Sequence, residues 1–288
     1  MRALGGRVAV ITGAGRGIGR EHALLFAAEG ASVLVNDLGG TSSGDGTDVS
    51  PAHDVVEQIR AAGGNAVANT ENVSTWDGAK SVVQQAVDEF VRLDVVINNA
   101  GILRDGFIAT LSEADWDAVI AVHLREHFSV LRHAAEYWKR QSKAGHQPMA
   151  SIINTASSSG TTVPNAGQAN YGSAKAAIAA LTLVAADELK RYGVRVNAIT
   201  PIARTLTLAT RGIGALVAEP DGGQADLFSP ANISPLVAYL ATENCPITGR
   251  MYAVQGGAIS QLAGWHEVNT IETDAAWQID DIAKRLPR

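Results

Sequence analysis

The sequence contains little cysteine, no long apolar run and no cluster of basic residues. Its one cysteine, Cys245, excludes an internal disulfide bond and any metal site built from cysteines, so we expect a buried or half-buried thiol and no metal. No stretch reaches the ~18 apolar residues of a membrane span, and no apolar run precedes the first strand-like segment. The net charge of -6, without a lysine or arginine run, argues against nucleic acid and anionic membranes as partners. These absences predict a soluble, cytoplasmic protein that acts on a small molecule.

The apolar residues are arranged as alternating strands and helices. With 288 residues, of which 46% are hydrophobic and 18% charged, the chain can bury a large core, and neither a linker nor an internal repeat divides it. Strand patterns cover residues 7–12, 32–36, 65–69, 94–98, 150–155, 195–199 and 251–254, and helix patterns cover 51–62, 76–90, 113–138, 169–191 and 234–241. This alternation predicts one doubly wound α/β domain with right-handed crossovers and a mainly parallel sheet of about seven strands. We expect this domain to span residues 1–264, followed by a tail, 265–288, with one short helix.

A glycine-rich turn and a helix directly follow the first strand. Gly13, Gly17 and Gly19 form the spacing G-x-x-x-G-x-G, and Gly15 is a further glycine in the same turn. Because glycine has no side chain, a diphosphate can approach the backbone and the positively polarised N-terminus of the helix. The alternative is that the glycines only shape a tight turn. The strand before them and the helix after them favour dinucleotide binding.

The second strand ends at an acidic residue, Asp37, which lies 18 residues after Gly19. An acid about 20 residues beyond such a loop accepts hydrogen bonds from the adenosine ribose hydroxyls, which predicts NAD as the cofactor. Arg16, inside the glycine loop, is the rival determinant because it can attract the 2′-phosphate of NADP. The remaining alternative is that Asp37 is only a turn residue. Residues 39–50 after it are rich in turn formers and predict an exposed loop.

The fourth strand is followed by Asn98, Asn99, Ala100 and Gly101. A ligand crevice is expected at the carboxyl end of such a strand, so these residues can support a cofactor or brace the sheet. Amide side chains commonly bond to neighbouring backbone. We therefore interpret this segment as structural residues around a site.

A hydroxyl, a phenol and an amine come together in residues 158–175. Tyr171 and Lys175 are four residues apart in a predicted helix and so share one face, while Ser158 lies 13 residues before the tyrosine at the end of a predicted strand. A nearby ammonium favours the phenolate form of tyrosine, and the pair suits proton transfer to a carbonyl or from a carbinol. Taken alone, the same residues can be an ordinary helical pair and a capping serine; the dinucleotide loop upstream favours the catalytic interpretation.

The regular alternation fails over residues 201–230, which hold several prolines and glycines and predict a substrate lid. Its apolar residues suit an acyl chain or a steroid equally well: Leu206, Leu208, Ile213, Leu216 and Val217. Three arginines are expected in loops near the same edge of the sheet, where they can bind the phosphates of coenzyme A or be simply solvated: Arg104, Arg204 and Arg211.

The ordered set TGAGRGIG (12–19), NNAG (98–101), Ser158 and YGSAK (171–175) resembles the short-chain dehydrogenase/reductase family over nearly the whole chain. The resemblance implies a single Rossmann-type domain, NAD(P)-dependent interconversion of carbonyls and alcohols, and a homodimer or homotetramer. It implies that Tyr171 is the acid/base, that Ser158 binds the carbonyl and that Lys175 bonds the nicotinamide ribose. The family's fourth position, an asparagine that supports a relay water, falls on His123, which is either a packing residue or part of a relay.

A closer resemblance is carried by NDLGG (36–40), NNAGILRD (98–105), VHL (122–124) and GQANY (167–171). These segments are similar to the (3R)-hydroxyacyl-CoA dehydrogenase units of multifunctional β-oxidation enzymes, a group also described as type 4 17β-hydroxysteroid dehydrogenases. Asn72-Val73 stands where most of the family has Asp-Val beside the adenine. The cofactor contacts that we expect on this basis are Gly13, Arg16, Gly17, Ile18, Gly19, Asp37, Asn72, Val73, Asn99, Ala100, Gly101, Tyr171, Lys175, Pro201, Ile202 and Thr205.

Two classes of function follow from these residues. The first is an NAD-dependent oxidoreductase acting on a 3-hydroxyacyl-CoA or 3-ketoacyl-CoA, with a hydroxysteroid dehydrogenase or a 3-ketoacyl-ACP reductase as alternatives. The second is a catalytically silent dinucleotide-binding protein on the same fold. A silent relative is expected to have lost Tyr171 or Lys175, and this sequence retains both.

Overall fold

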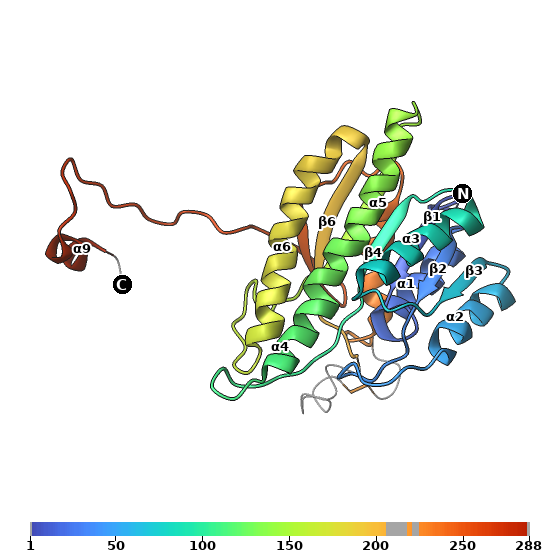
Figure 1. Ribbon diagram of the computed structural model, residues 1–288, viewed down its shortest axis with the longest axis horizontal. Helices are drawn as coiled ribbons and strands as arrows, with labels where there is room; N and C mark the ends of the chain where they lie inside the picture. The colour runs from blue at the N-terminus through green and yellow to red at the C-terminus, as the bar shows by residue number, and fades with distance from the viewer. Residues whose placement is uncertain (1, 206–217, 221–224, 287–288) are drawn as a thin grey trace.

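A computed structural model describes residues 2–205, 218–220 and 225–286 of the chain. Its centre is an eight-stranded sheet in the order β3-β2-β1-β4-β5-β6-β7-β8 (Figure 1). The strands are β1 Val8–Thr12, β2 Ser32–Asn36, β3 Asn65–Asn69, β4 Val95–Asn98, β5 Ala150–Thr155, β6 Val194–Pro201, β7 Met251–Gln255 and β8 Ala258–Leu262. All neighbours are parallel except β7 and β8, which are antiparallel. The predicted doubly wound α/β domain is therefore confirmed.

The central strands are buried on both faces, which explains their nearly continuous apolar sequences. Every residue of β1, β4 and β5 is buried. Helices α1 (Gly17–Ala28), α2 (Ser50–Ala61) and α8 (Ser234–Ala241) contribute to one apolar core, and α3 (Trp76–Phe90), α5 (Glu126–Lys143) and α6 (Ala169–Leu189) contribute to another. Parallel strands need such cover because crossover helices lie on both faces of the sheet.

The strand order reverses between β1 and β4, because β2 and β3 extend the sheet in one direction and β4 to β8 in the other. In open α/β sheets, the carboxyl ends of the strands at this reversal form a crevice that binds ligands. The glycine turn follows β1, and the NNAG segment follows β4. The fold thus brings these two predicted site segments to one place.

The structure differs from the sequence predictions at one long helix. The predicted helix 113–138 is divided into α4 (Glu113–Ile120), a π-helical turn (Ala121–Arg125) and α5, which continues to Lys143. A π turn inserts one residue into the helical repeat, and such turns are frequent at functional sites. The side chains after it are therefore rotated relative to an uninterrupted helix.

The sheet has one strand more than predicted, because β8 returns beside β7. Gln255 pairs with Ala258, so only Gly256 and Gly257 form the turn. Gly256 has φ +53°, a left-handed conformation that glycine adopts readily and that two-residue hairpins need. The helix predicted over 169–191 also ends earlier, at Leu189, and a 3₁₀ turn (Lys190–Tyr192) follows it.

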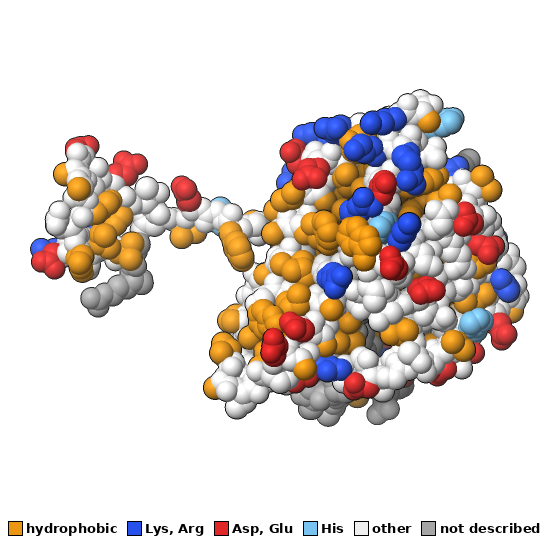
Figure 2. All heavy atoms as spheres, in the orientation of Figure 1, with side chains coloured by type: hydrophobic (Ala, Val, Ile, Leu, Met, Phe, Trp, Pro, Cys, Tyr) orange, Lys and Arg blue, Asp and Glu red, His pale blue; other side chains and the backbone are white. Residues whose placement is uncertain are grey.

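The tail after residue 264 runs away from the domain and ends in the predicted short helix, α9 (Ile279–Arg285) (Figure 1). Apolar side chains are visible along it in Figure 2. Trp265 is among the most exposed of the large hydrophobic residues in the described part of the chain. Cys245 is buried, as expected for a free thiol. Among the described residues, no helix combines the length and apolarity that crossing a membrane requires.

Candidate active site

A cavity of about 580 Å³ opens where the strand order reverses. Its wall is formed by the glycine turn, the segments after β2, β3, β4, β5 and β6, the π turn and the start of α6. Of the predicted site residues, Gly19 alone is not in this wall. The others line the cavity: Gly13, Arg16, Gly17, Ile18, Asp37, Asn72, Val73, Asn99, Ala100, Gly101, His123, Ser158, Tyr171, Lys175, Pro201, Ile202 and Thr205.

The glycine turn packs so closely against its neighbours that side chains are excluded. Gly13 (φ +60°) would place a Cβ 2.8 Å from the Cα of Ala100. A Cβ on Gly19 would lie 2.1 Å from the carbonyl oxygen of Gly13, so this glycine lets the helix approach the turn from behind the cavity. Helix α1 begins at Gly17, which puts its N-terminus at the cavity. This cradle fits the diphosphate of a dinucleotide.

Asn99 braces the glycine turn from the β4 side. Its Nδ2 donates to the carbonyl oxygens of Thr12 and Gly13, both at 3.1 Å. The amides of Asn99 and Ala100 donate to Thr12 Oγ1 at 2.9 and 3.1 Å. Asn98 points into the sheet instead, where its Nδ2 donates to the side-chain oxygen of Asn154 at 2.9 Å. These contacts agree with the interpretation of this segment as a brace around a site.

Asp37 holds the glycine turn and the following loop together. Its Oδ2 accepts from the amide of Gly15 at 2.8 Å and its Oδ1 accepts from the amide of Gly39 at 2.7 Å. Each carboxylate oxygen can accept a second hydrogen bond, so ribose hydroxyls can still be bound. The rival residue, Arg16, donates from Nη1 to the carbonyl oxygen of Gly40 at 3.0 Å. Both candidate determinants of cofactor choice therefore line the same part of the cavity.

Lys175 lies in the deepest part of the site, next to Tyr171. Its side chain is buried, and Nζ donates to the carbonyl oxygen of Thr155 at 2.5 Å and lies 5.6 Å from the centroid of the Tyr171 ring. Burial lowers the pKa of Lys175 to about 7, because an ammonium loses its hydration there, while the charge of Glu126 acts in the opposite direction.

Asn170 orients the start of α6: its Oδ1 accepts from the Tyr171 amide at 2.7 Å, and its Nδ2 donates to the Arg104 carbonyl oxygen at 2.8 Å.

The loop after β5 carries Ser158 into the cavity wall. The Ser158 carbonyl oxygen accepts from three successive amides, of residues 161, 162 and 163, at 3.0 to 3.1 Å. The neighbouring Ser159 hydroxyl donates to Gln168 Oε1 at 2.9 Å, and Gln168 Nε2 donates to both carboxylate oxygens of Asp105 at 3.1 Å. Sequence reasoning missed Gln168 and Asp105. The signal for Gln168 lay inside GQANY, but its partner is 63 residues away.

His123 lies in the π turn, next to Tyr171. Its ring stands edge-on to Tyr171, with centroids 5.1 Å apart, and its Nε2 lies 2.8 Å from the carbonyl oxygen and 3.2 Å from the amide of Ile102. Burial, assisted by the Lys175 charge, holds the pKa of His123 well below its ordinary value. The ring is therefore neutral and oriented by backbone. Whether it packs or takes part in a relay stays a prediction.

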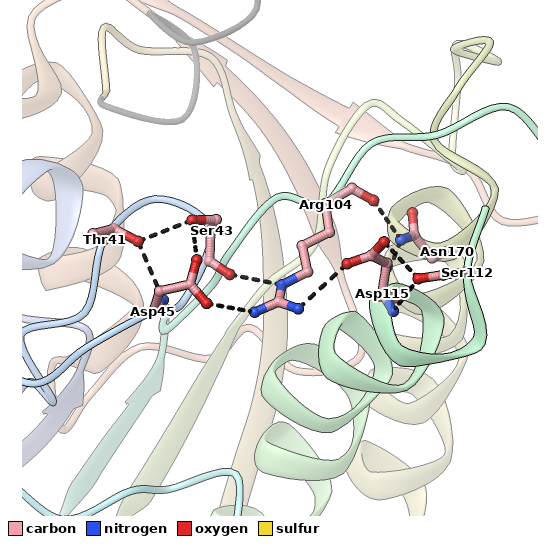
Figure 3. A network of polar contacts seen from close by, with 7 residues as sticks. All are labelled: Thr41, Ser43, Asp45, Arg104, Ser112, Asp115 and Asn170. Carbon is pink, nitrogen blue, oxygen red and sulfur yellow. Dashed lines mark hydrogen bonds and ion pairs between the residues drawn. The ribbon is translucent and has the colours of Figure 1, made fainter. Parts of the chain in front are cut away.

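The mouth of the cavity is tied together by Arg104 (Figure 3). Its guanidinium donates to the Ser43 carbonyl oxygen at 2.8 Å, to Asp45 at 3.0 Å and to Asp115 at 3.3 Å. Arg204 pairs in a similar way with Asp226. Two of the three arginines considered as phosphate ligands, Arg104 and Arg204, are thus engaged by carboxylates. The third, Arg211, and the apolar lid residues Leu206, Leu208, Ile213, Leu216 and Val217 lie outside the described residues.

The chain matches the short chain dehydrogenase family over residues 7–215, and it belongs to that family. Members share an oxidoreductase chemistry that uses a nicotinamide dinucleotide, so the protein is an alcohol/ketone oxidoreductase of this class.

Three individual proteins of this family show the extent of the similarity. The chain is 39% identical to the hydroxyacyl-CoA dehydrogenase ChsB1 of Mycobacterium tuberculosis, with 98% of this chain and 88% of that protein covered. It is 45% identical to the peroxisomal multifunctional enzyme type 2 of Drosophila melanogaster over 90% of this chain, but spans only 39% of that enzyme. A crystal structure of a short chain dehydrogenase from Mycobacterium avium is 46% identical, with a TM-score of 0.87 over 98% of this chain and 94% of that one.

Proposed function

We propose that the protein is an NAD(H)-dependent dehydrogenase that interconverts 3-hydroxyacyl and 3-ketoacyl thioesters of coenzyme A. The observation that carries the proposal is the buried Lys175 Nζ 5.6 Å from the centroid of the Tyr171 ring, in the same cavity wall as the glycine turn and Ser158. A silent dinucleotide-binding protein needs no such arrangement. An alcohol dehydrogenase needs an acid/base beside the nicotinamide, and this pair supplies it.

The residues divide the chemistry between them. The bound nicotinamide supplies or accepts the hydride. Tyr171 exchanges the proton of the substrate oxygen, and Ser158 holds that oxygen by a hydrogen bond. Lys175 is held by the Thr155 carbonyl oxygen, and its positive charge favours the phenolate form of Tyr171. His123 packs edge-on against the tyrosine ring.

Asp37 supports NAD(H) over NADP(H). Its carboxylate lines the cavity and is fixed by the amides of Gly15 and Gly39, so it is preorganised to accept from ribose hydroxyls and to repel a 2′-phosphate. The remaining cofactor contacts proposed from the family pattern are the residues of the cavity wall given above. Gly19 contributes instead through its close packing under the turn.

The thioester substrate is supported by the names of the relatives, one called a hydroxyacyl-CoA dehydrogenase and another a peroxisomal multifunctional enzyme. We further propose that the protein acts as a homodimer or homotetramer, as the family pattern implies. We propose the cytoplasm as its location.

The test compares kcat/KM for acetoacetyl-CoA, a longer 3-ketoacyl-CoA, a 3-ketoacyl-ACP and a free 17-ketosteroid, each with NADH and NADPH. We expect the CoA thioesters with NADH to be preferred. A preference for the steroid or the ACP thioester of more than about tenfold, roughly 1.4 kcal/mol of transition-state discrimination, contradicts the proposed substrate. A preference for NADPH contradicts the role of Asp37, and no turnover with any substrate contradicts the oxidoreductase itself.

A further inference from the structure

Two neighbouring ionisable residues at the start of α5, Glu126 and His127, are buried completely. Neither side chain has any exposed area, and Glu126 Oε2 lies 2.5 Å from His127 Nδ1. Taking a carboxylate out of water is unfavourable unless an opposite charge lies close by. A helix that only covers a sheet needs apolar side chains at such positions. The pair therefore requires an explanation that packing does not give.

The position of Glu126 relative to the catalytic pair follows from two helical segments that lie side by side (Figure 1). The π turn faces α6 where His123 contacts Tyr171 at 5.1 Å between ring centroids. Glu126 comes three residues after His123, and Lys175 comes four residues after Tyr171. Glu126 and Lys175 therefore both lie about one turn beyond the contact of His123 with Tyr171, on neighbouring segments.

The charges agree with this placement. Burial lowers the pKa of Lys175 to about 7, and the negative charge of Glu126 raises it from the value that burial alone would give. His127 is close enough to His123 for its charge to lower the pKa of that ring. The four ionisable side chains of this region thus influence one another through a medium from which water is largely absent.

Among the described residues around Lys175, Glu126 is the carboxylate whose charge acts on the lysine. Helix α6 itself contributes Tyr171, and the π turn contributes His123, whose ring is neutral. The strands contribute uncharged groups, among them the Thr155 carbonyl oxygen that accepts from Nζ. Helix α4 contributes Asp115, but its carboxylate is at the mouth of the cavity and is held by Arg104.

We propose that Glu126 is a positioning residue whose carboxylate keeps Lys175 in its ammonium form. This inference rests on the proposed function, because it concerns the state of the lysine that acts on Tyr171. It assigns the purpose of the buried pair to the chemistry and not to the packing of α5.

The proposal predicts the direction in which loss of the Glu126 charge changes the pKa of Lys175. Without the Glu126 charge, the pKa of Lys175 falls further, so the lysine loses its proton at a lower pH. A neutral amine no longer favours the phenolate, and ketone reduction by the ammonium form declines. The decline is small where wild-type and variant lysines are both protonated and large where only the wild-type lysine is.

The first experiment measures kcat and KM for reduction of acetoacetyl-CoA by NADH with Glu126→Gln, which keeps the shape of the side chain and removes its charge. The pH range runs from about pH 6 to about pH 9, on both sides of the pKa of about 7. We expect the falling limb of kcat to move to lower pH, with a loss on the order of tenfold on that limb, since one pKa unit is a tenfold change in protonation ratio. Glu126→Asp should restore part of the wild-type profile.

The matched control is Glu136→Gln on the exposed face of the same helix, where the carboxylate pairs with Arg132 and Arg140. This variant should leave the pH profile unchanged. If Glu126→Gln lowers kcat by the same factor at every pH, the residue has only a structural role and the proposal is overturned.

A second experiment does not depend on catalysis. Lys175→Met leaves Glu126 buried without its counter-charge, so it should lower Tm markedly; in the Glu126→Gln background the same change should lower Tm much less. Additive Tm changes overturn the proposed pairing. A clear coupling in Tm without turnover of any ketone retains the pairing and contradicts the proposed function instead.

Discussion

The two ends of the cavity use charge in opposite ways. At the mouth, Arg104 keeps 25% of its side-chain area exposed and pairs with Asp45 and Asp115, which are 68% and 40% exposed. At the inner end, Lys175, His123 and Glu126 have at most 2% of their area exposed. Exposed ion pairs commonly contribute only ~0.2–1 kcal/mol because water and salt screen them. Buried charges interact strongly and shift one another's protonation.

This difference in exposure divides the cavity into a mouth whose charges fix its shape and an inner end whose charges take part in the chemistry. The network at the mouth joins the loop after β2, the segment after β4, α4 and α6, so it fixes the shape of the entrance (Figure 3). The inner charges have few partners and set the chemical state of the groups that meet the substrate. Substitutions at the inner end should therefore change kcat, and those at the mouth should change KM.

The largest expected effect is at Tyr171. Tyr171→Phe removes the phenolic oxygen and keeps the ring that contacts His123, so NADH should still bind while kcat falls by about 10²- to 10⁴-fold, the usual contribution of general acid/base catalysis. Steady-state kinetics and a fluorescence titration with NADH measure the two quantities. Tyr239→Phe, on the exposed side of α8, is the control and should have no effect. Near-normal turnover of Tyr171→Phe would rule out the proposed acid/base role.

An intermediate effect is expected at Asp37, in the cavity wall beside the glycine turn. Asp37→Ala removes a charged acceptor, and hydrogen bonds to charged groups contribute ~1.5–3 kcal/mol, so the ratio of kcat/KM for NADH over NADPH should fall by roughly tenfold or more. Both individual KM values should also rise, because the amides of Gly15 and Gly39 lose their acceptor. The ratio is thus the diagnostic quantity.

Arg16→Ala gives the opposite test for cofactor choice. If Arg16 is the determinant, removing it lowers the use of NADPH, and Asp37→Ala leaves the ratio unchanged. That outcome would show that Arg16, and not Asp37, determines the choice between NADH and NADPH.

Much of the fold, and the residues expected at the catalytic centre, could be predicted from the sequence, because they depend on local patterns. Buried parallel strands read as short apolar runs, glycines mark the turn at β1, and the four-residue spacing of Tyr171 and Lys175 survives in the real helix. The extra strand β8 was missed although Gly256 and Gly257, between two strand-like segments, are a hairpin signal.

The inner end was the harder part to predict. The π turn at 121–125 leaves no mark in hydrophobic periodicity, and it changes which side chains of the following helix face inward. Glu126 and His127 have the composition of a solvated helix face and are nevertheless buried. The partners at the mouth were also unpredictable, since Arg104 and Asp45 are 59 residues apart. Long-range polar pairing has no sequence period.

The smallest expected effect is at the mouth. Arg104→Ala removes two exposed ion pairs and the hydrogen bond to the Ser43 carbonyl oxygen, so the loop after β2 should loosen. KM for NADH should rise only a few-fold, with kcat unchanged, because exposed ion pairs contribute only ~0.2–1 kcal/mol each. Added salt should reduce the difference between wild type and variant. Arg140→Ala, which removes an exposed pair on α5 far from the mouth, is the control.

The same variant separates two roles of Arg104. If it only holds the loops, Asp45→Asn should raise KM in the same direction as Arg104→Ala, and KM for acetoacetyl-CoA should change no more than KM for a small 3-ketoester without phosphates. If Arg104 leaves its carboxylates to bind a coenzyme A phosphate, Asp45→Asn should lower KM for the thioester, because it frees the guanidinium. In that case Arg104→Ala should raise KM for the thioester alone. The mouth would then bind substrate as well as keep its own shape. Its charges could no longer be assigned a purely structural role.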